Sequence, residues 1–252
     1  WVLNPEHIRQ FKNWVPIVPI DHDPVPSPIF DRLKMAYRVI SYSQFGHNEL
    51  KRVGMHSTYI PHMVDTKVFK PMNTPEIKQK LGINPAVYVM GMVAANKDIP
   101  PRKSFQQVLD AFKMFLTKEP NTILYIHSDP HFPGGFPIDA YATFLGIQDK
   151  VVFPGIEFPS IYKMKFNIGK SQMAEIYNMM DVLLAPSTSE GFCVPIIEAQ
   201  ACGIPVITQD WTAMSELVED GVNGYKVKPL TKIWTSMQSY SAIPDTNDIF
   251  DK

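Results

Sequence analysis

The stretch Val182-Leu-Leu-Ala-Pro-Ser-Thr-Ser-Glu-Gly-Phe-Cys-Val-Pro-Ile-Ile-Glu-Ala-Gln-Ala-Cys-Gly-Ile-Pro-Val-Ile207 decides the fold. It opens with an apolar run that is typical of a strand buried on both faces, and Pro186 ends that run. Pro195 suits the first residue of a helix, where its missing N–H would be unpaired in any case. Gly203 follows the helix end, and Pro205 prevents continuation. The stretch therefore predicts a strand, a loop and a helix.

Two glutamates in this stretch carry the first functional signal. Glu190 falls in the loop at the carboxyl end of the strand, and Glu198 falls about one turn inside the helix. The N–H groups of Phe192, Cys193 and Val194 point out of the helix start, where a phosphate or sugar oxygen is favoured. Because a carboxylate can accept hydrogen bonds from two adjacent hydroxyls, a sugar–diphosphate–ribose ligand fits. The same spacing also fits a capping Glu190 and a solvated Glu198, so both interpretations stay open.

Composition limits the classes of protein to consider. The 252 residues are 45% hydrophobic, which suits one large domain or two small ones with a sizeable core. A formal net charge of -1 argues against broad attraction to nucleic acid or anionic lipid. No apolar run reaches about eighteen residues, so no membrane span is expected.

The ends and the cysteines give weaker signals. The 2 cysteines, Cys193 and Cys202, fall at opposite ends of one expected helix, so we expect no disulfide between them. A reducing compartment is the simplest inference. The chain begins with Trp1 rather than Met, and we expect a fragment that lacks the start of its first domain.

Strands and helices alternate along most of the chain. Beyond residue 80, strands are expected at 87–94, 122–126, 151–153, 182–185, 205–208 and 224–227, with helices at 103–118, 138–145, from about 171, from 195 and at 214–218. This alternation predicts an α/β fold with a doubly wound parallel sheet, covered by helices on both faces, whose ligands bind at the carboxyl ends of strands. Shorter β and α pieces before residue 67 predict β-α-β parts of a first domain that is incomplete at its start. The polar, proline-containing segment Lys67–Lys80 favours domains at 1–70 and 71–252.

A basic loop follows the first strand of the larger domain. The loop Asn96–Lys103 contains Lys97, Arg102 and Lys103. A bidentate arginine and a compact lysine charge suit a diphosphate, although a solvated basic loop fits the same residues. Since this loop and the Glu190 loop both follow strands of one parallel sheet, we expect them at one edge.

Two histidine clusters offer further candidates. His127, Asp129 and His131 are metal-ligand types, but no fourth ligand is evident, and an ordinary polar loop is the preferred interpretation. His22, between two aspartates after an apolar run, is either a base or sugar contact or part of a structural turn. The chain contains no Ser-His-Asp arrangement and no phosphate-binding glycine fingerprint.

Several motifs together resemble the family-four retaining glycosyltransferases. The resemblance rests on the runs Glu175–Ser187, Ser189–Phe192, Pro195–Ala199, Ala201–Ile207, Glu216–Gly221 and Asn223-Gly224, with Ile60–Thr66, Phe69 and Pro71 similar to the domain-junction motif. It extends from about Ile60 to Val227 and implies the GT-B architecture, in which two Rossmann-like domains face each other.

The resemblance also implies roles for individual residues. Glu190 would hold hydroxyls of the donor sugar, and Glu198 would bind the ribose diol. Arg102 and Lys103 would neutralise the diphosphate leaving group. Main-chain N–H groups of Phe192, Cys193 and Val194 would contact donor sugar or phosphate, and His22 would lie near the reacting sugar. The sequence departs from the family pattern at Cys193 and Met63, where glycine is usual, at Ala95, where some members have arginine, and in a longer basic loop.

The implied activity is a retaining, metal-independent glycosyl transfer from a UDP-, GDP- or ADP-linked sugar to a hydroxyl acceptor such as a glycan or glycolipid. It needs no cofactor and no nucleic acid, and the family expectation is a cytoplasmic enzyme with peripheral membrane contact. Two alternatives are a sugar-nucleotide epimerase or phosphorylase on the same architecture and a non-catalytic fragment that only binds nucleotide.

Overall fold

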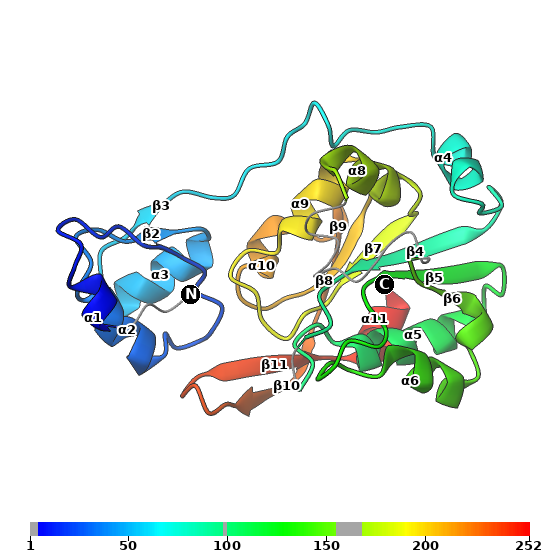
Figure 1. Cartoon of the computed structure of the whole chain (residues 1–252). Coiled ribbons are helices and arrows are strands. Elements are labelled where there is room, and N and C mark those ends of the chain that lie inside the picture. Colours follow the sequence, from blue (N-terminus) through cyan, green and yellow to red (C-terminus); the bar gives the residue numbers. More distant parts are fainter. Residues whose placement is uncertain (1–4, 98–99, 155–167) are drawn as a thin grey trace.

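The computed structural model describes residues 5–97, 100–154 and 168–252, and two parallel sheets organise them (Figure 1). The smaller sheet has the order β1 (Ile17–Val18), β2 (Ile40–Ser41), β3 (Thr58–Tyr59). The larger sheet has the order β6 (Val151–Val152), β5 (Thr122–His127), β4 (Tyr88–Val93), β7 (Val182–Ala185), β8 (Val206–Gln209), β9 (Gly224–Val227). Every pair in both sheets is parallel, which confirms the predicted α/β class.

The N-terminal unit, residues 5–60, surrounds the smaller sheet. It contains α1 (Pro5–Ile8), α2 (Ser27–Leu33) and α3 (Gln44–Arg52). Its own core consists of buried aliphatic side chains, among them Val18, Ile20, Ile29, Leu33 and Leu50. An extended segment after β3 joins it to the larger unit, residues 69–252 (Figure 1). The short β and α pieces expected before residue 67 are confirmed by β2 and α3.

Helices cover both faces of the larger sheet, as expected for a doubly wound fold. One face packs against α4 (Thr74–Lys80), α8 (Lys170–Asn178), α9 (Val194–Ala201) and α10 (Met214–Leu217). The other packs against α5 (Phe105–Leu116), α6 (Ile138–Leu145) and α11 (Thr246–Asp251). The α5 residues Phe105, Val108, Leu109 and Phe112 follow helical spacing and are all buried, so they form the face of α5 that packs on the sheet.

The strand order places a reversal between β4 and β7. From β4 the chain proceeds outward to β5 and β6, and then returns to add β7, β8 and β9 on the opposite side. Loops that leave the carboxyl ends of β4 and β7 consequently diverge, and ligands of open α/β sheets bind in the crevice at such a point. The two loops singled out from the sequence are those two.

The local predictions around α9 hold, with a shift of one residue. The helix begins at Val194, so Pro195 is its second residue, where a backbone N–H has no helical partner either. At the other end Gly203 has φ +80°, Ile204 N donates to Ala199 O at 3.0 Å, and Gly203 N donates to Gln200 O at 2.9 Å. This is the glycine-terminated helix end that the sequence indicated.

The region after β9 contains elements that we did not expect. An antiparallel hairpin, β10 (Pro229–Trp234) with β11 (Tyr240–Pro244), follows β9 and precedes α11. The short helices α1, α2 and α4 and the 3-10 turn η1 (Gln148–Lys150) were also missed. In Figure 1 the hairpin, at the red end of the colour scale, extends from the larger unit toward the N-terminal unit. The hairpin is hydrogen-bonded to the N-terminal unit, a contact that we did not expect, since Tyr240 N donates to Asp23 O at 2.8 Å.

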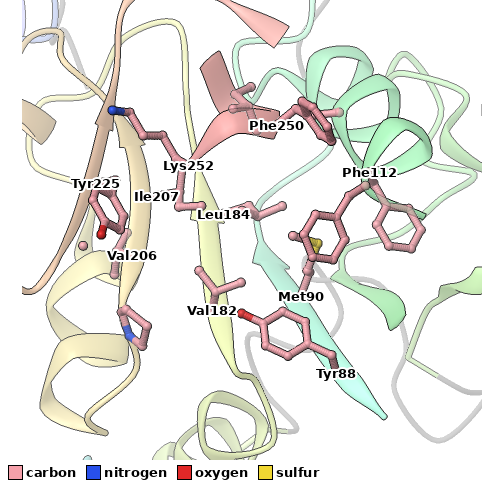
Figure 2. A pocket seen from close by; sticks show the side chains of 15 residues that line it. Tyr88, Met90, Phe112, Val182, Leu184, Val206, Ile207, Tyr225, Phe250 and Lys252 are labelled. Atoms are coloured by element: carbon pink, nitrogen blue, oxygen red, sulfur yellow. The ribbon is translucent and has the colours of Figure 1, made fainter. Parts of the chain in front are cut away.

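A small apolar pocket lies at the amino ends of the strands of the larger sheet, opposite the carboxyl ends from which the loops after β4 and β7 leave (Figure 2). Its volume is about 160 Å³, and Tyr88, Val182, Val206 and Tyr225, near the amino ends of four strands, contribute to its lining together with Phe112 of α5. Because ligands of such sheets bind at carboxyl ends, this pocket is a packing gap under α11 and not the candidate site. Among the residues described, no helix combines the length and apolar character needed to cross a bilayer.

Candidate functional site

The loops after β4 and β7 are bonded to each other. Thr188 N donates to Arg102 O at 2.8 Å, and Arg102 Nη1 donates to Ser189 O at 2.8 Å. The start of the basic loop is fixed by the buried amide of Asn96, which donates to Phe136 O at 2.8 Å and accepts from Phe136 N at 2.7 Å. Asp98 and Ile99 of this loop lie outside the described residues. The expectation that the two loops share one edge is confirmed.

Glu190 is the anionic centre of the site. Its carboxylate is almost fully buried and pairs with Arg102 Nη1 at 2.8 Å and with Lys103 Nζ. Burial by itself raises the pKa of Glu190, but the charges and hydrogen bonds of Lys103 and Arg102 outweigh burial and lower its pKa to about 2. Glu190 is therefore ionised at neutral pH, and the two cations already have an anionic partner.

The turn into α9 presents main-chain donors. Cys193, the residue before the helix, has φ +76° in the left-handed region, which a residue with a side chain rarely adopts. Within the described part of the chain, the N–H groups of Phe192, Cys193 and Val194 donate no hydrogen bond. Burial raises the pKa of the Cys193 thiol to about 12, with a further contribution from Glu190, so this cysteine is no thiolate nucleophile at neutral pH.

The N-terminal unit supplies the facing wall, from the carboxyl ends of its own strands. Asp21 follows β1, Tyr42 follows β2 and His62 follows β3. The Tyr42 and His62 rings stack with centroids 3.9 Å apart, and the His62 ring meets the edge of Phe192 at 5.1 Å. The carboxyl edges of both parallel sheets thus face each other.

A cleft of about 410 Å³ lies between the two units, in the size range of ligand sites. Its lining contains Asp21, Tyr42 and His62 from the N-terminal unit and Lys97, Arg102, Lys103, Glu190, Phe192, Cys193 and Val194 from the larger unit. Six residues predicted from the sequence are therefore brought together: Arg102, Lys103, Glu190, Phe192, Cys193 and Val194. We call this space the interunit cleft.

Two predicted site residues lie elsewhere. Glu198, half-buried inside α9, is not part of the cleft lining, and its Oε2 accepts a hydrogen bond from Tyr177 Oη at 2.8 Å. Burial raises the pKa of Glu198. His22 borders a neighbouring cavity instead, while its Nδ1 lies 2.5 Å from Asp21 Oδ1. Their roles toward a ligand stay predictions.

Sequence reasoning assigned no ligand role to Tyr42, His62 or Lys97. The signal that could have found the first two was present, since each follows a short strand of a parallel sheet, where ligands are bound. Lys97 was counted with the basic loop but given no role of its own. The strands before Tyr42 and His62 are only two residues long, so their carboxyl ends were hard to place.

The histidines of the other cluster do not converge. His127 is buried, its Nδ1 lies 2.9 Å from Tyr125 Oη, and burial lowers its pKa to about 4. His131 instead approaches Asp139 at 3.3 Å on the surface. Within the described ranges, no three His, Cys, Asp or Glu side chains are grouped to hold a metal ion.

Residues 73–233 match the family described as Glycosyl transferases group 1, which is more than half of the chain. The chain belongs to the group 1 glycosyl transferases. The match covers β4 to β9 with the helices between them and contains the loops that carry Arg102, Lys103 and Glu190. It ends within β10, so the second strand of the hairpin lies outside it.

Relatives of this group 1 glycosyl transferase are distant in sequence. It is 29% identical over 170 residues to D-inositol 3-phosphate glycosyltransferase of Segniliparus rotundus, covering 67% of this chain and 35% of the relative. It is 27% identical to the lipopolysaccharide core biosynthesis mannosyltransferase LpsB of Rhizobium meliloti, covering 66% of this chain and 44% of that one. The chain therefore spans less than half the length of these relatives.

Solved structures show the shared fold. Sucrose-phosphate synthase from Thermosynechococcus elongatus aligns with TM-score 0.71 at 20% identity, over 98% of this chain and 59% of that one. HepE of Anabaena, solved in complex with UDP and glucose, aligns with TM-score 0.65 at 22% identity, over 86% and 58%. These neighbours are GT-B glycosyltransferases, so the expected architecture of two Rossmann-like sheets is confirmed.

Proposed function

We propose that this chain forms the donor side, and part of the acceptor side, of a glycosyltransferase that uses a nucleoside diphosphate sugar. The observation that carries the proposal is the convergence of Lys97, Arg102 and Lys103 on one cleft at the strand-order reversal. Cations there suit the diphosphate of the leaving group, because positive charge aimed at developing phosphate charge stabilises the transition state. Family membership favours this transferase over the epimerase and phosphorylase alternatives.

The remaining roles follow from position in the cleft. The N–H groups at the start of α9, which donate to no described residue, are suited to a phosphate or sugar oxygen. Glu190, next to them, would exchange its cation contacts for hydroxyls of the donor sugar. Glu198 and its partner Tyr177 would meet the ribose diol beyond the cleft lining, and His22 would face the reacting sugar from the N-terminal unit. With Lys97, Arg102 and Lys103 in the cleft, the diphosphate needs no metal ion in this proposal.

Retention of configuration rests on the family resemblance. In that mechanism the departing phosphate oxygen takes the acceptor proton on the same face of the sugar, so no protein nucleophile is required. Orientation of donor and acceptor by the two facing units then supplies much of the catalysis. The donor base, the sugar, the cytoplasmic setting and contact with a membrane surface stay expectations of the family.

Nucleotide binding tests the proposal directly. UDP, GDP or ADP should raise the midpoint temperature of thermal unfolding. At a hundredfold excess over Kd, the bound nucleotide should increase the free energy of unfolding by about 2.7 kcal/mol. Lys103→Ala should weaken the binding of that nucleotide by at least about tenfold, since one charge-assisted contact is lost. Lys113→Ala, on the exposed side of α5, is the matched control and should bind normally. In a form that carries out transfer, Lys103→Ala should lower turnover on the order of a hundredfold.

Two results would contradict the proposal. Absence of stabilisation by all three nucleoside diphosphates removes the donor assignment. Equal nucleotide affinity in Lys103→Ala and the wild-type chain would show that the cations do not contact phosphate.

A further inference from the structure

A second cavity of about 420 Å³ adjoins the interunit cleft, and the β10–β11 hairpin forms one of its walls. We call it the hairpin cavity. Its other walls come from Pro100 to Arg102 of the basic loop, the first turn of α5, the Thr188-Ser189 pair and His22. Its volume lies within the range of about 300 to 1,000 Å³ of small-molecule sites.

The two spaces meet at the residues that would handle the leaving group. Arg102 lines both. Ser189 lines the hairpin cavity and the next residue, Glu190, lines the cleft. His22 likewise lines the hairpin cavity and the preceding Asp21 lines the cleft, and His22 Nδ1 lies 2.5 Å from Asp21 Oδ1. A molecule in the hairpin cavity would thus lie beside the diphosphate cations, where an acceptor hydroxyl has to approach the donor sugar.

The hairpin is a fixed wall. Strand pairing sets Ser241 opposite Ile233, so these two side chains share the face that lines the cavity. The opposite face packs on the larger unit, where Lys232 Nζ lies 4.2 Å from the Trp211 ring centre. Ala242 N donates to Thr188 O at 3.1 Å, and the bond from Tyr240 N to Asp23 O ties the hairpin to the N-terminal unit.

The lining favours an uncharged ligand with many hydroxyls. Ile233 and Pro100 give it apolar surface, while Ser189 and Gln107 give it hydroxyl and amide groups. Ser189 is 1% exposed, and its carbonyl accepts from Arg102 Nη1, while its hydroxyl has no hydrogen bond to another described residue and is available to a ligand hydroxyl. No carboxylate is found among the described lining residues, and the guanidinium of Arg102 already faces Glu190.

We propose that the hairpin cavity is the acceptor subsite and that it takes the end of a neutral carbohydrate, with the hairpin deciding which sugar is accepted. This inference rests on the proposed function, because an acceptor has a meaning only beside a donor. The family match ends inside β10, so the strand carrying Ser241 is beyond the shared region, as expected of a specificity element.

The test fills the cavity and measures two ligands separately. Ser241→Tyr places a large ring in the cavity, and Ser236→Tyr, the same change at an exposed position in the hairpin turn, is the control. The nucleoside diphosphate is UDP, or GDP or ADP if that is the one that binds. With this nucleotide saturating, binding of maltose, lactose and mannobiose is followed by saturation-transfer NMR on the full chain. We expect at least one disaccharide to bind the wild-type chain and Ser236→Tyr equally, and Ser241→Tyr to weaken it at least tenfold. The UDP Kd should change less than twofold in either variant.

The outcomes separate the inference from the proposed function. If none of UDP, GDP and ADP binds the wild-type chain, the proposed function is overturned and this subsite with it. Normal UDP binding without binding of any disaccharide overturns the subsite alone. So does disaccharide binding that Ser241→Tyr leaves intact. If Ser241→Tyr fails to bind UDP, Ile233→Trp on the same face serves as the second variant and must give the same selective loss.

Discussion

At the scale of single residues, Glu190 and its two cations define the site. The carboxylate occupies the same Arg102 and Lys103 groups that a diphosphate would use. Under the proposed function, a diphosphate would have to displace a buried ion pair, and the cost of that displacement would reduce its affinity. In return, the carboxylate released from the cations would become available for sugar hydroxyls at the moment of binding.

Replacing this carboxylate should raise nucleotide affinity. Glu190→Gln leaves the cations without their internal anion, so UDP should bind on the order of tenfold more tightly, comparable to one charge-assisted hydrogen bond. Isothermal calorimetry measures the change, and Glu119→Gln on the surface is the control. A loss of UDP affinity in Glu190→Gln would show instead that Glu190 mainly holds the cations in position.

At the scale of elements, α3 of the N-terminal unit is capped by the larger unit. Ser43 Oγ accepts from Gly46 N at 3.0 Å, an ordinary cap within the helix. The preceding donors, Gln44 N and Phe45 N, bond the Glu216 carboxylate of α10 at 2.9 and 2.8 Å. A negative charge at a helix start is favoured by the helix dipole, so Glu216 joins the two units at a point away from the cleft lining.

Loss of this carboxylate should expose the start of α3. In Glu216→Ala the amide hydrogens of Gln44 and Phe45 should exchange about five to ten times faster, because a lost cap costs about 1 kcal/mol. Hydrogen exchange followed by NMR gives the rates residue by residue. Glu219→Ala, three residues further along, should leave both amides protected, and unchanged protection in Glu216→Ala would mean that the bonds do not persist in solution.

At the scale of the whole molecule, the two units meet where a glycine is required. A Cβ on Gly191 would lie 2.5 Å from Pro19 Cβ and 2.7 Å from Pro19 Cα, well inside van der Waals contact. The absence of a side chain at Gly191 therefore lets the carboxyl edges of the two sheets approach and enclose the cleft.

Adding one methyl group at this contact should separate the units. Gly191→Ala is expected to lower the free energy of unfolding by about 1–3 kcal/mol and to weaken nucleotide binding, since the cleft opens. Urea unfolding and calorimetry report the two effects, and Gly169→Ala, where a Cβ meets nothing within 4 Å, is the matched control. Wild-type stability in Gly191→Ala would show that the units do not hold this contact in solution.

The sequence by itself determined the doubly wound sheet and the turn around Glu190, because buried strands, proline, glycine and helical spacing act locally. It also determined that Arg102 meets Glu190, because the topology of a parallel sheet brings the loops after its strands to one edge. Only the tertiary structure decided which groups line the cleft. His62 and Tyr42 follow strands of only two residues, and nothing in the local sequence pattern shows that their side chains turn toward the loops of the larger unit. The hairpin wall depends on pairing with Thr188 and Asp23, far away in the chain, and contacts of that kind leave no local periodicity to detect.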